Sequence, residues 1–185
     1  MYYHCSPISG LKWLKPCKPQ NFDKPKQVYM TTSLPMALMY GIRNFEYTYG
    51  YTKAGQIYFE EYFPDALQIL YAGKRASLYE CLPEAIGTTQ IPNEVVSAVP
   101  VEVVRETPIP DVMQALLEQE RIGALIIRRY EQLSPETKEW IFRAELEEIK
   151  KRDLLHTPSP MADYIKRCYP AVWAAASEEK ATPED

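Results

Sequence analysis

A strand that runs directly into a helix is encoded by residues 28–40, which read VYMTTSLPMALMY. The β-branched and aromatic residues of 27–32 favour a strand. Ser33 is a good helix N-cap, and Pro35 fits the first helical turn, where proline is tolerated. We therefore expect a strand at 27–32, followed by a helix from residue 34 that frays near Arg43.

Short strands separated by turn signals surround this unit. Hairpin-turn sequences occur at residues 53–55 and 73–75, and residues 15–26 form a loop rich in lysine and proline. The other expected strands are Tyr2–Cys5, Phe45–Thr52, Gln56–Phe63, Leu67–Ala72, Ser77–Leu82, Glu94–Val99 and Val101–Glu106.

The sequence becomes mostly helical after residue 108. Asp111–Gln119 carries apolar residues at helical spacing, and residues 134–136 form a helix start whose helix should run to about Leu155. Asp163–Ala176 predicts a last helix, whereas Ala124–Tyr130 fits either a buried strand or a helix.

The expected fold class is α+β. We expect a small split β-sheet core at residues 1–108 and a helical extension, packed on it or beside it, at residues 109–176. Residues 177–185 are polar and are expected to form a disordered tail.

Composition narrows the class of protein. The chain has 185 residues and a formal charge of −4, which argues against a broad phosphate-binding surface. No apolar run reaches the roughly 18–20 residues of a membrane span, and the first residues lack the features of a signal peptide. The four cysteines form no C-x-x-C pair, so we expect reduced thiols, no metal site and a cytoplasmic location.

Three features in chain order carry the candidate chemistry. His4-Cys5-Ser6 ends the first strand, Tyr29 and Tyr40 lie eleven residues apart on the strand–helix unit, and Glu94 opens a late strand. A cationic ring between two tyrosine faces gains from stacking and from the ring quadrupole. A carboxylate can stabilise positive charge that develops on a sugar as a glycosidic bond breaks.

This order resembles the His-Tyr-Glu class of ADP-ribosyltransferases, the group that includes diphtheria toxin and the poly(ADP-ribose) polymerases. The resemblance covers roughly residues 2–106, and Cys5 stands where the family has glycine. It implies that NAD is the substrate, that Glu94 is the catalytic carboxylate, and that ADP-ribose passes to a protein or nucleic-acid acceptor. The cofactor-binding residues that it implies are His4 (ribose hydroxyl), Cys5 (nicotinamide amide, through its backbone), Ser6 (carboxamide), and Tyr29 and Tyr40 (nicotinamide ring).

Other readings of these residues stay open. His4 and the two tyrosines also fit core positions, and Glu94 also fits a solvated strand start; Glu80 is the reserve carboxylate, ahead of Glu60 and Glu61. Two alternative functions share the fold: an NAD-dependent RNA 2′-phosphotransferase, and a non-catalytic binding module whose C-terminal helices contact a protein partner.

Overall fold

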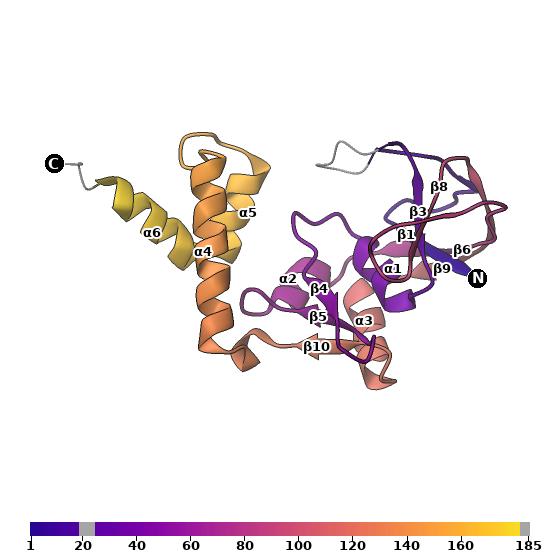
Figure 1. Ribbon diagram of the computed structural model, residues 1–185, viewed down its shortest axis with the longest axis horizontal. Coiled ribbons are helices and arrows are strands. Elements are labelled where there is room, and N and C mark those ends of the chain that lie inside the picture. Colours follow the sequence, from indigo (N-terminus) through magenta and orange to yellow (C-terminus); the bar gives the residue numbers. More distant parts are fainter. Residues whose placement is uncertain (19–24, 182–185) are drawn as a thin grey trace. The chain divides into compact units, whose positions relative to one another are not determined.

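The computed structural model describes residues 1–18 and 25–181 (Figure 1). Parts of the expected loop at 15–26 and of the expected tail at 177–185 therefore lie outside the described residues. The α+β class is confirmed: a larger antiparallel sheet and a smaller sheet occur together with α-helices.

The larger sheet has seven strands within the described ranges, in the order β2-β9-β6-β1-β3-β8-β7. Its strands are β1 Tyr2–Ser6, β2 Trp13–Leu14, β3 Val28–Thr31, β6 Ala76–Cys81, β7 Gly87–Thr88, β8 Glu94–Ser97 and β9 Val101–Ile109. The smaller sheet, of order β10-β5-β4, contains β4 Tyr49–Tyr51, β5 Ile57–Glu60 and β10 Ile126–Arg128.

The helices that the structure describes follow the chain in order. They are α1 Leu34–Tyr40, α2 Ala66–Tyr71, α3 Val112–Arg121, α4 Pro135–Lys151, α5 Pro160–Cys168 and α6 Pro170–Ala181, with a short 3-10 turn at Tyr130–Gln132. None of the helices in these ranges is both long and apolar enough to cross a bilayer.

The chain forms two compact units. Unit 1 comprises Met1–Tyr47, Tyr51–Tyr58 and Leu67–Ile126, and unit 2 comprises Thr48–Gly50, Phe59–Ala66 and Ile127–Asp185. Helix α3, which lies beyond residue 108 and was expected in the helical extension, therefore belongs to the same unit as the larger sheet.

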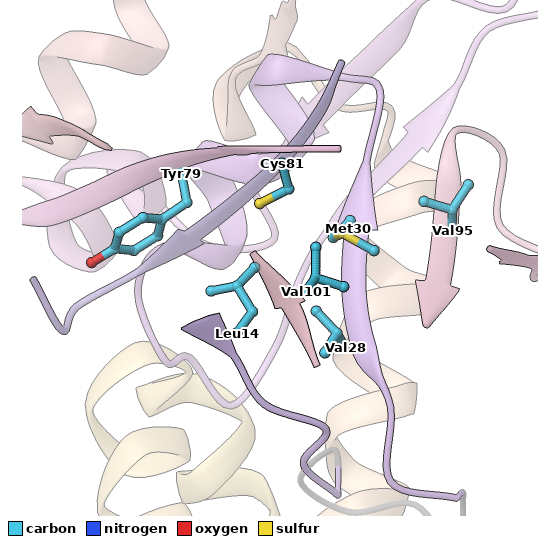
Figure 2. Packing of buried hydrophobic residues seen from close by; sticks show 7 residues of the cluster. All are labelled: Leu14, Val28, Met30, Tyr79, Cys81, Val95 and Val101. Atoms are coloured by element: carbon cyan, nitrogen blue, oxygen red, sulfur yellow. The ribbon is translucent and has the colours of Figure 1, made fainter. Parts of the chain in front are cut away.

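One buried hydrophobic cluster of unit 1 lies on one face of the larger sheet (Figure 2). Val28 and Met30 of β3 are buried there, as period-2 alternation predicts, together with Tyr79 of β6. The remaining buried members of the cluster are Leu14, Cys81, Val95 and Val101.

Unit 2 is held by helix packing and by aromatic contacts. Helices α4 and α5 both pack against α6. The Phe63 ring meets the rings of Tyr164 and Tyr169 edge-on, with centroids 6.3 Å and 5.2 Å away, a geometry that aromatic pairs prefer.

Three expectations about secondary structure are wrong. The segment expected as a strand at Leu67–Ala72 is helix α2, whose buried residues Ala66, Leu67 and Leu70 follow helical spacing. The single helix expected at Asp163–Ala176 is divided into α5 and α6, because Pro170 cannot continue a helix as a hydrogen-bond donor. Residues 177–181, expected to be disordered, continue α6.

Candidate functional site

The larger sheet is weakly joined between β1 and β3. The ladder between these strands consists of the single pair Tyr3↔Thr31, whereas β1 and β6 are paired along all of β1. In a continued ladder, Cys5 would lie opposite Tyr29, but that pair does not form. The strands therefore part at the residues that the sequence analysis singled out.

His4 bridges the place where the ladder stops. Its Nδ1 atom lies 2.9 Å from the backbone oxygen of Tyr29. A carbonyl oxygen only accepts, so Nδ1 carries the proton in this bond. Burial lowers the pKa of His4, partly offset by the bond to Tyr29, so the ring is neutral near pH 7 and Nε2 holds a lone pair that can accept a hydrogen bond.

Tyr29 and Glu94 come together on neighbouring strands. The register pairs Thr31 with Glu94 and Tyr29 with Val96, so the side chains of Tyr29 and Glu94 lie on the same face of the sheet. Burial raises the pKa of Tyr29, and the nearby charge of Glu94 raises it further.

The Tyr29 hydroxyl has an unusual environment. Its oxygen is shielded from solvent and has no hydrogen-bond partner within the described part of the chain. A buried hydroxyl without a partner costs free energy, because it loses its bonds to water. An orphaned hydroxyl beside a carboxylate is the kind of group that a polar ligand satisfies.

The side chain of Cys5 points toward helix α1. It is buried. A Cβ added to Gly41, the residue that ends α1, would lie 2.6 Å from the Cys5 Sγ. Burial raises the pKa of Cys5 to about 12, so the thiol is neutral. Ser6, next in sequence, turns back on its own loop, where its Oγ accepts from the amide of Ile8 at 3.2 Å.

Tyr40 lies at the last turn of α1, and its ring stacks on Tyr47. The two ring centroids are 4.4 Å apart, with 26° between the ring planes. Tyr47 is fixed in turn, because its hydroxyl donates to Ile42 O at 2.9 Å and accepts from Asn44 N at 3.2 Å. Tyr40 remains partly exposed, and the stack with Tyr47 occupies one face of its ring.

Neither a scan of protein-family models nor a search among curated proteins finds a match for this chain. The resemblance to His-Tyr-Glu ADP-ribosyltransferases therefore rests on the residues of the chain itself. Among the residues in the described ranges, no group of histidine, cysteine, aspartate and glutamate side chains is arranged to hold a metal ion.

The other candidate carboxylates have structural partners. The buried carboxylate of Glu80 accepts two hydrogen bonds from the guanidinium of Arg105, one of them 2.7 Å long from Nε. Glu60 pairs with Arg128 at 2.9 Å, and Glu61 accepts from the amide of Tyr130 at 3.2 Å. These contacts account for the positions of all three acids without a ligand.

Tyr51 is a residue of this region that the sequence analysis did not select. Its hydroxyl donates to the backbone oxygen of Pro92 at 2.8 Å, two residues before Glu94. The only sequence signal was the alternation of Tyr47, Tyr49 and Tyr51, which could place these rings along one face but named no partner.

Proposed function

We propose that this chain is an NAD-dependent ADP-ribosyltransferase-like protein that cleaves the bond between nicotinamide and ribose. The observation that carries the proposal is the junction of β1 and β3. There the His4 ring is bonded to the Tyr29 backbone. On the other face of the sheet, which carries the side chains of Tyr29 and Glu94, a tyrosine hydroxyl with no partner among the described residues lies near the Glu94 carboxylate.

The residues at the junction suit the parts of NAD. The resemblance alone assigns a ribose hydroxyl to the Nε2 lone pair of neutral His4, because the register places the His4 side chain on the opposite face of the sheet from Tyr29 and Glu94. The rings of Tyr40 and Tyr29 are the aromatic surfaces that the proposal offers to the cationic nicotinamide. Ser6 would reach the carboxamide only after its hydroxyl leaves the bond to Ile8 N, so its part in the proposal is the least supported by its contacts.

Cys5 takes its role in the proposal from the resemblance. The family uses the backbone of a glycine at this position, and a side chain there must point away from the ligand. The Cys5 side chain is buried toward Gly41 of the helix end, on the face of the sheet that also carries Tyr29. The proposal assigns the nicotinamide amide to the backbone groups of Cys5.

The proposed reaction needs one carboxylate. The bond between the ribose C1′ and the nicotinamide nitrogen breaks, and its electron pair goes to nicotinamide, which leaves as a neutral ring. Positive charge then develops on the ribose, where Glu94 stabilises it. A nucleophile of the acceptor, or water, bonds to C1′ and releases a proton to solvent. The leaving group needs no protonation, unlike the leaving oxygen of a glycoside.

Nicotinamide release from NAD tests the proposal. We expect the wild-type chain to release nicotinamide and Glu94→Gln to lower the rate constant about 100-fold or more, with NAD affinity by calorimetry changed by less than about threefold. Glu102→Gln is the matched control, because Glu102 is an exposed acid of β9 in the same sheet. Release that survives Glu94→Gln would remove Glu94 from its role.

The alternatives give different results in the same experiments. A non-catalytic module would bind NAD, or a protein partner, without releasing nicotinamide. An RNA 2′-phosphotransferase would remove a 2′-phosphate from RNA only when NAD is present. A chain that neither binds NAD nor releases nicotinamide would contradict the proposal.

A further inference from the structure

The position of Glu94 depends on a tight turn that directly precedes it. Asn93 has a φ of +65°, in the left-handed region that asparagine tolerates better than most residues. The amide of Glu94 donates to the backbone oxygen of Ile91 at 3.2 Å, which closes the turn. Strand β8 begins at Glu94 itself, so any shift of this turn moves the carboxylate.

One side of the turn is held by the end of β3. The amide of Thr32 donates to Asn93 O at 3.0 Å, and the Thr32 hydroxyl donates to Asn93 Oδ1 at 3.2 Å. The preceding residue, Thr31, pairs in register with Glu94. The strand that carries Tyr29 therefore fixes one flank of the turn.

The other side of the turn is held by Tyr51. Its hydroxyl donates to Pro92 O at 2.8 Å and lies 3.6 Å from the sulfur of Met36. Met36 is almost fully buried, and its sulfur also accepts from Thr31 Oγ1 at 3.3 Å. The phenol therefore lies between helix α1 and the turn.

The carboxylate lies near this phenol. Burial raises the pKa of Tyr51, a hydrogen bond with the Asn93 side chain lowers it, and the charge of Glu94 raises it. Tyr51 thus contacts the backbone of Pro92 and the side chain of Asn93. The charge of Glu94, the next residue, is close enough to raise the pKa of Tyr51.

We propose that Tyr51 is a positioning residue for the proposed NAD cleavage, one that holds the turn at 91–94 so that the Glu94 carboxylate faces the ribose. This inference rests on the proposed function. Tyr51 acts through Pro92 and Asn93 and is not itself placed against the substrate. A displacement of about 1 Å at a reacting group can cost about 100-fold in rate, so one tether to the turn is significant for catalysis.

The test compares Tyr51→Phe with the matched control Tyr58→Phe. The first change removes the hydroxyl that donates to Pro92 and leaves the ring in place. Tyr58 is a half-buried tyrosine of β5 in the same unit. We expect Tyr51→Phe to lower the rate constant of nicotinamide release about tenfold and to change the Kd for NAD less than about twofold, whereas Tyr58→Phe should change neither.

A second readout does not depend on turnover. The amide of Glu94 closes the turn, so its hydrogen exchange reports whether the turn is held. We expect Tyr51→Phe to speed this exchange about tenfold, since the turn opens more often without the tether. The amides of the β6–β9 ladder should exchange as in the wild type, as should every amide of the turn in Tyr58→Phe.

The outcomes separate this inference from the proposed function. Faster exchange together with a lower rate constant and an unchanged Kd supports the positioning role. Unchanged exchange, or faster exchange with an unchanged rate constant, overturns it while leaving NAD cleavage intact. A wild-type chain that releases no nicotinamide overturns the proposed function and, with it, any catalytic role of Tyr51.

Discussion

Gly41 leaves room for the thiol of Cys5, and filling that room tests how β1 packs against the end of α1. A Cβ on residue 41 would stand 2.6 Å from Cys5 Sγ, 3.1 Å from the oxygen of Leu38 and 3.3 Å from Ala76 Cβ, whereas ordinary contact begins at 3.4 Å. The φ of Gly41 is −63°, which alanine adopts freely. Any loss of stability in Gly41→Ala therefore comes from packing and not from the backbone.

The size of the effect follows from the closest contact. Cys5 is 4% exposed, so its sulfur cannot turn into solvent without opening the core. Overpacking of this kind costs about 1–3 kcal/mol. For a chain of this length, each kcal/mol lowers Tm by about 2–4 °C. Urea unfolding at pH 7 measures the loss of free energy of unfolding directly.

A double variant identifies the cause. Cys5→Ala alone should cost about 1–2 kcal/mol in lost packing, because it leaves a small void. In Cys5→Ala/Gly41→Ala the new methyl group takes the place of the sulfur, so the double variant should be more stable than the sum of the two losses by about 1–2 kcal/mol. The contact with Leu38 remains in the double variant, which should stay somewhat below the wild type. Additive losses, or no loss in Gly41→Ala, would refute the packing described here.

Three further variants test polar groups of the sheet. Burial lowers the pKa of His4 below its ordinary 6.5. The unfolded chain therefore binds the proton first, so stability is full above about pH 6.5 and falls as the pH drops below it. His4→Gln should flatten this slope in urea titrations at several pH values, and an unchanged slope would contradict the reasoning. Tyr29→Phe removes a buried hydroxyl that has no partner among the described residues. It should leave the free energy of unfolding unchanged or raise it by about 1 kcal/mol, and a clear loss would mean that the hydroxyl is bonded. Tyr79→Phe should lower the free energy of unfolding by about 1–3 kcal/mol, because the Tyr79 hydroxyl donates to Ile8 O at 2.6 Å and accepts from Leu11 N at 3.3 Å. Thermal melting that matches the wild type would contradict this prediction.

Local signals in the sequence were sufficient for several elements. Ser33 was predicted to cap a helix, and its Oγ accepts from Met36 N in the structure. Ser134 was predicted to cap another, and its Oγ accepts from Thr137 N. Such caps act over three residues, so a short window of sequence contains both partners.

Tertiary context decided the elements that were predicted wrongly. The run at 67–72 is apolar and short, and such runs fit a strand or a buried helix equally well. Its burial on helical spacing, with Leu67 and Leu70 inside, follows from neighbours that the local sequence does not contain. Asp65, just before α2, has a φ of +56°, in the left-handed region that aspartate tolerates better than most residues.

The candidate site was predictable only in part. Alternation correctly separated Tyr29 from Val28 and Met30, which are buried in the core. The bond from His4 joins residues 25 positions apart, and the bond from Tyr51 to Pro92 spans 41 positions. These contacts depend on strand order and register, which periodicity does not specify. Whether Tyr29, Tyr40 and Glu94 act on one ligand stays a prediction.

The parting of β1 from β3 makes a seam in the middle of the larger sheet. Strands β1 and β3 are joined by one ladder pair and by the bond from the His4 imidazole, whereas β1 and β6 are paired along all of β1. Acid acts here through the ring itself, because a protonated imidazole is costly to bury even though its Nδ1–H still donates to Tyr29 O. Mild acidification should therefore loosen the sheet first along this line, so that amide protection in β3 falls before protection in β6 and β9.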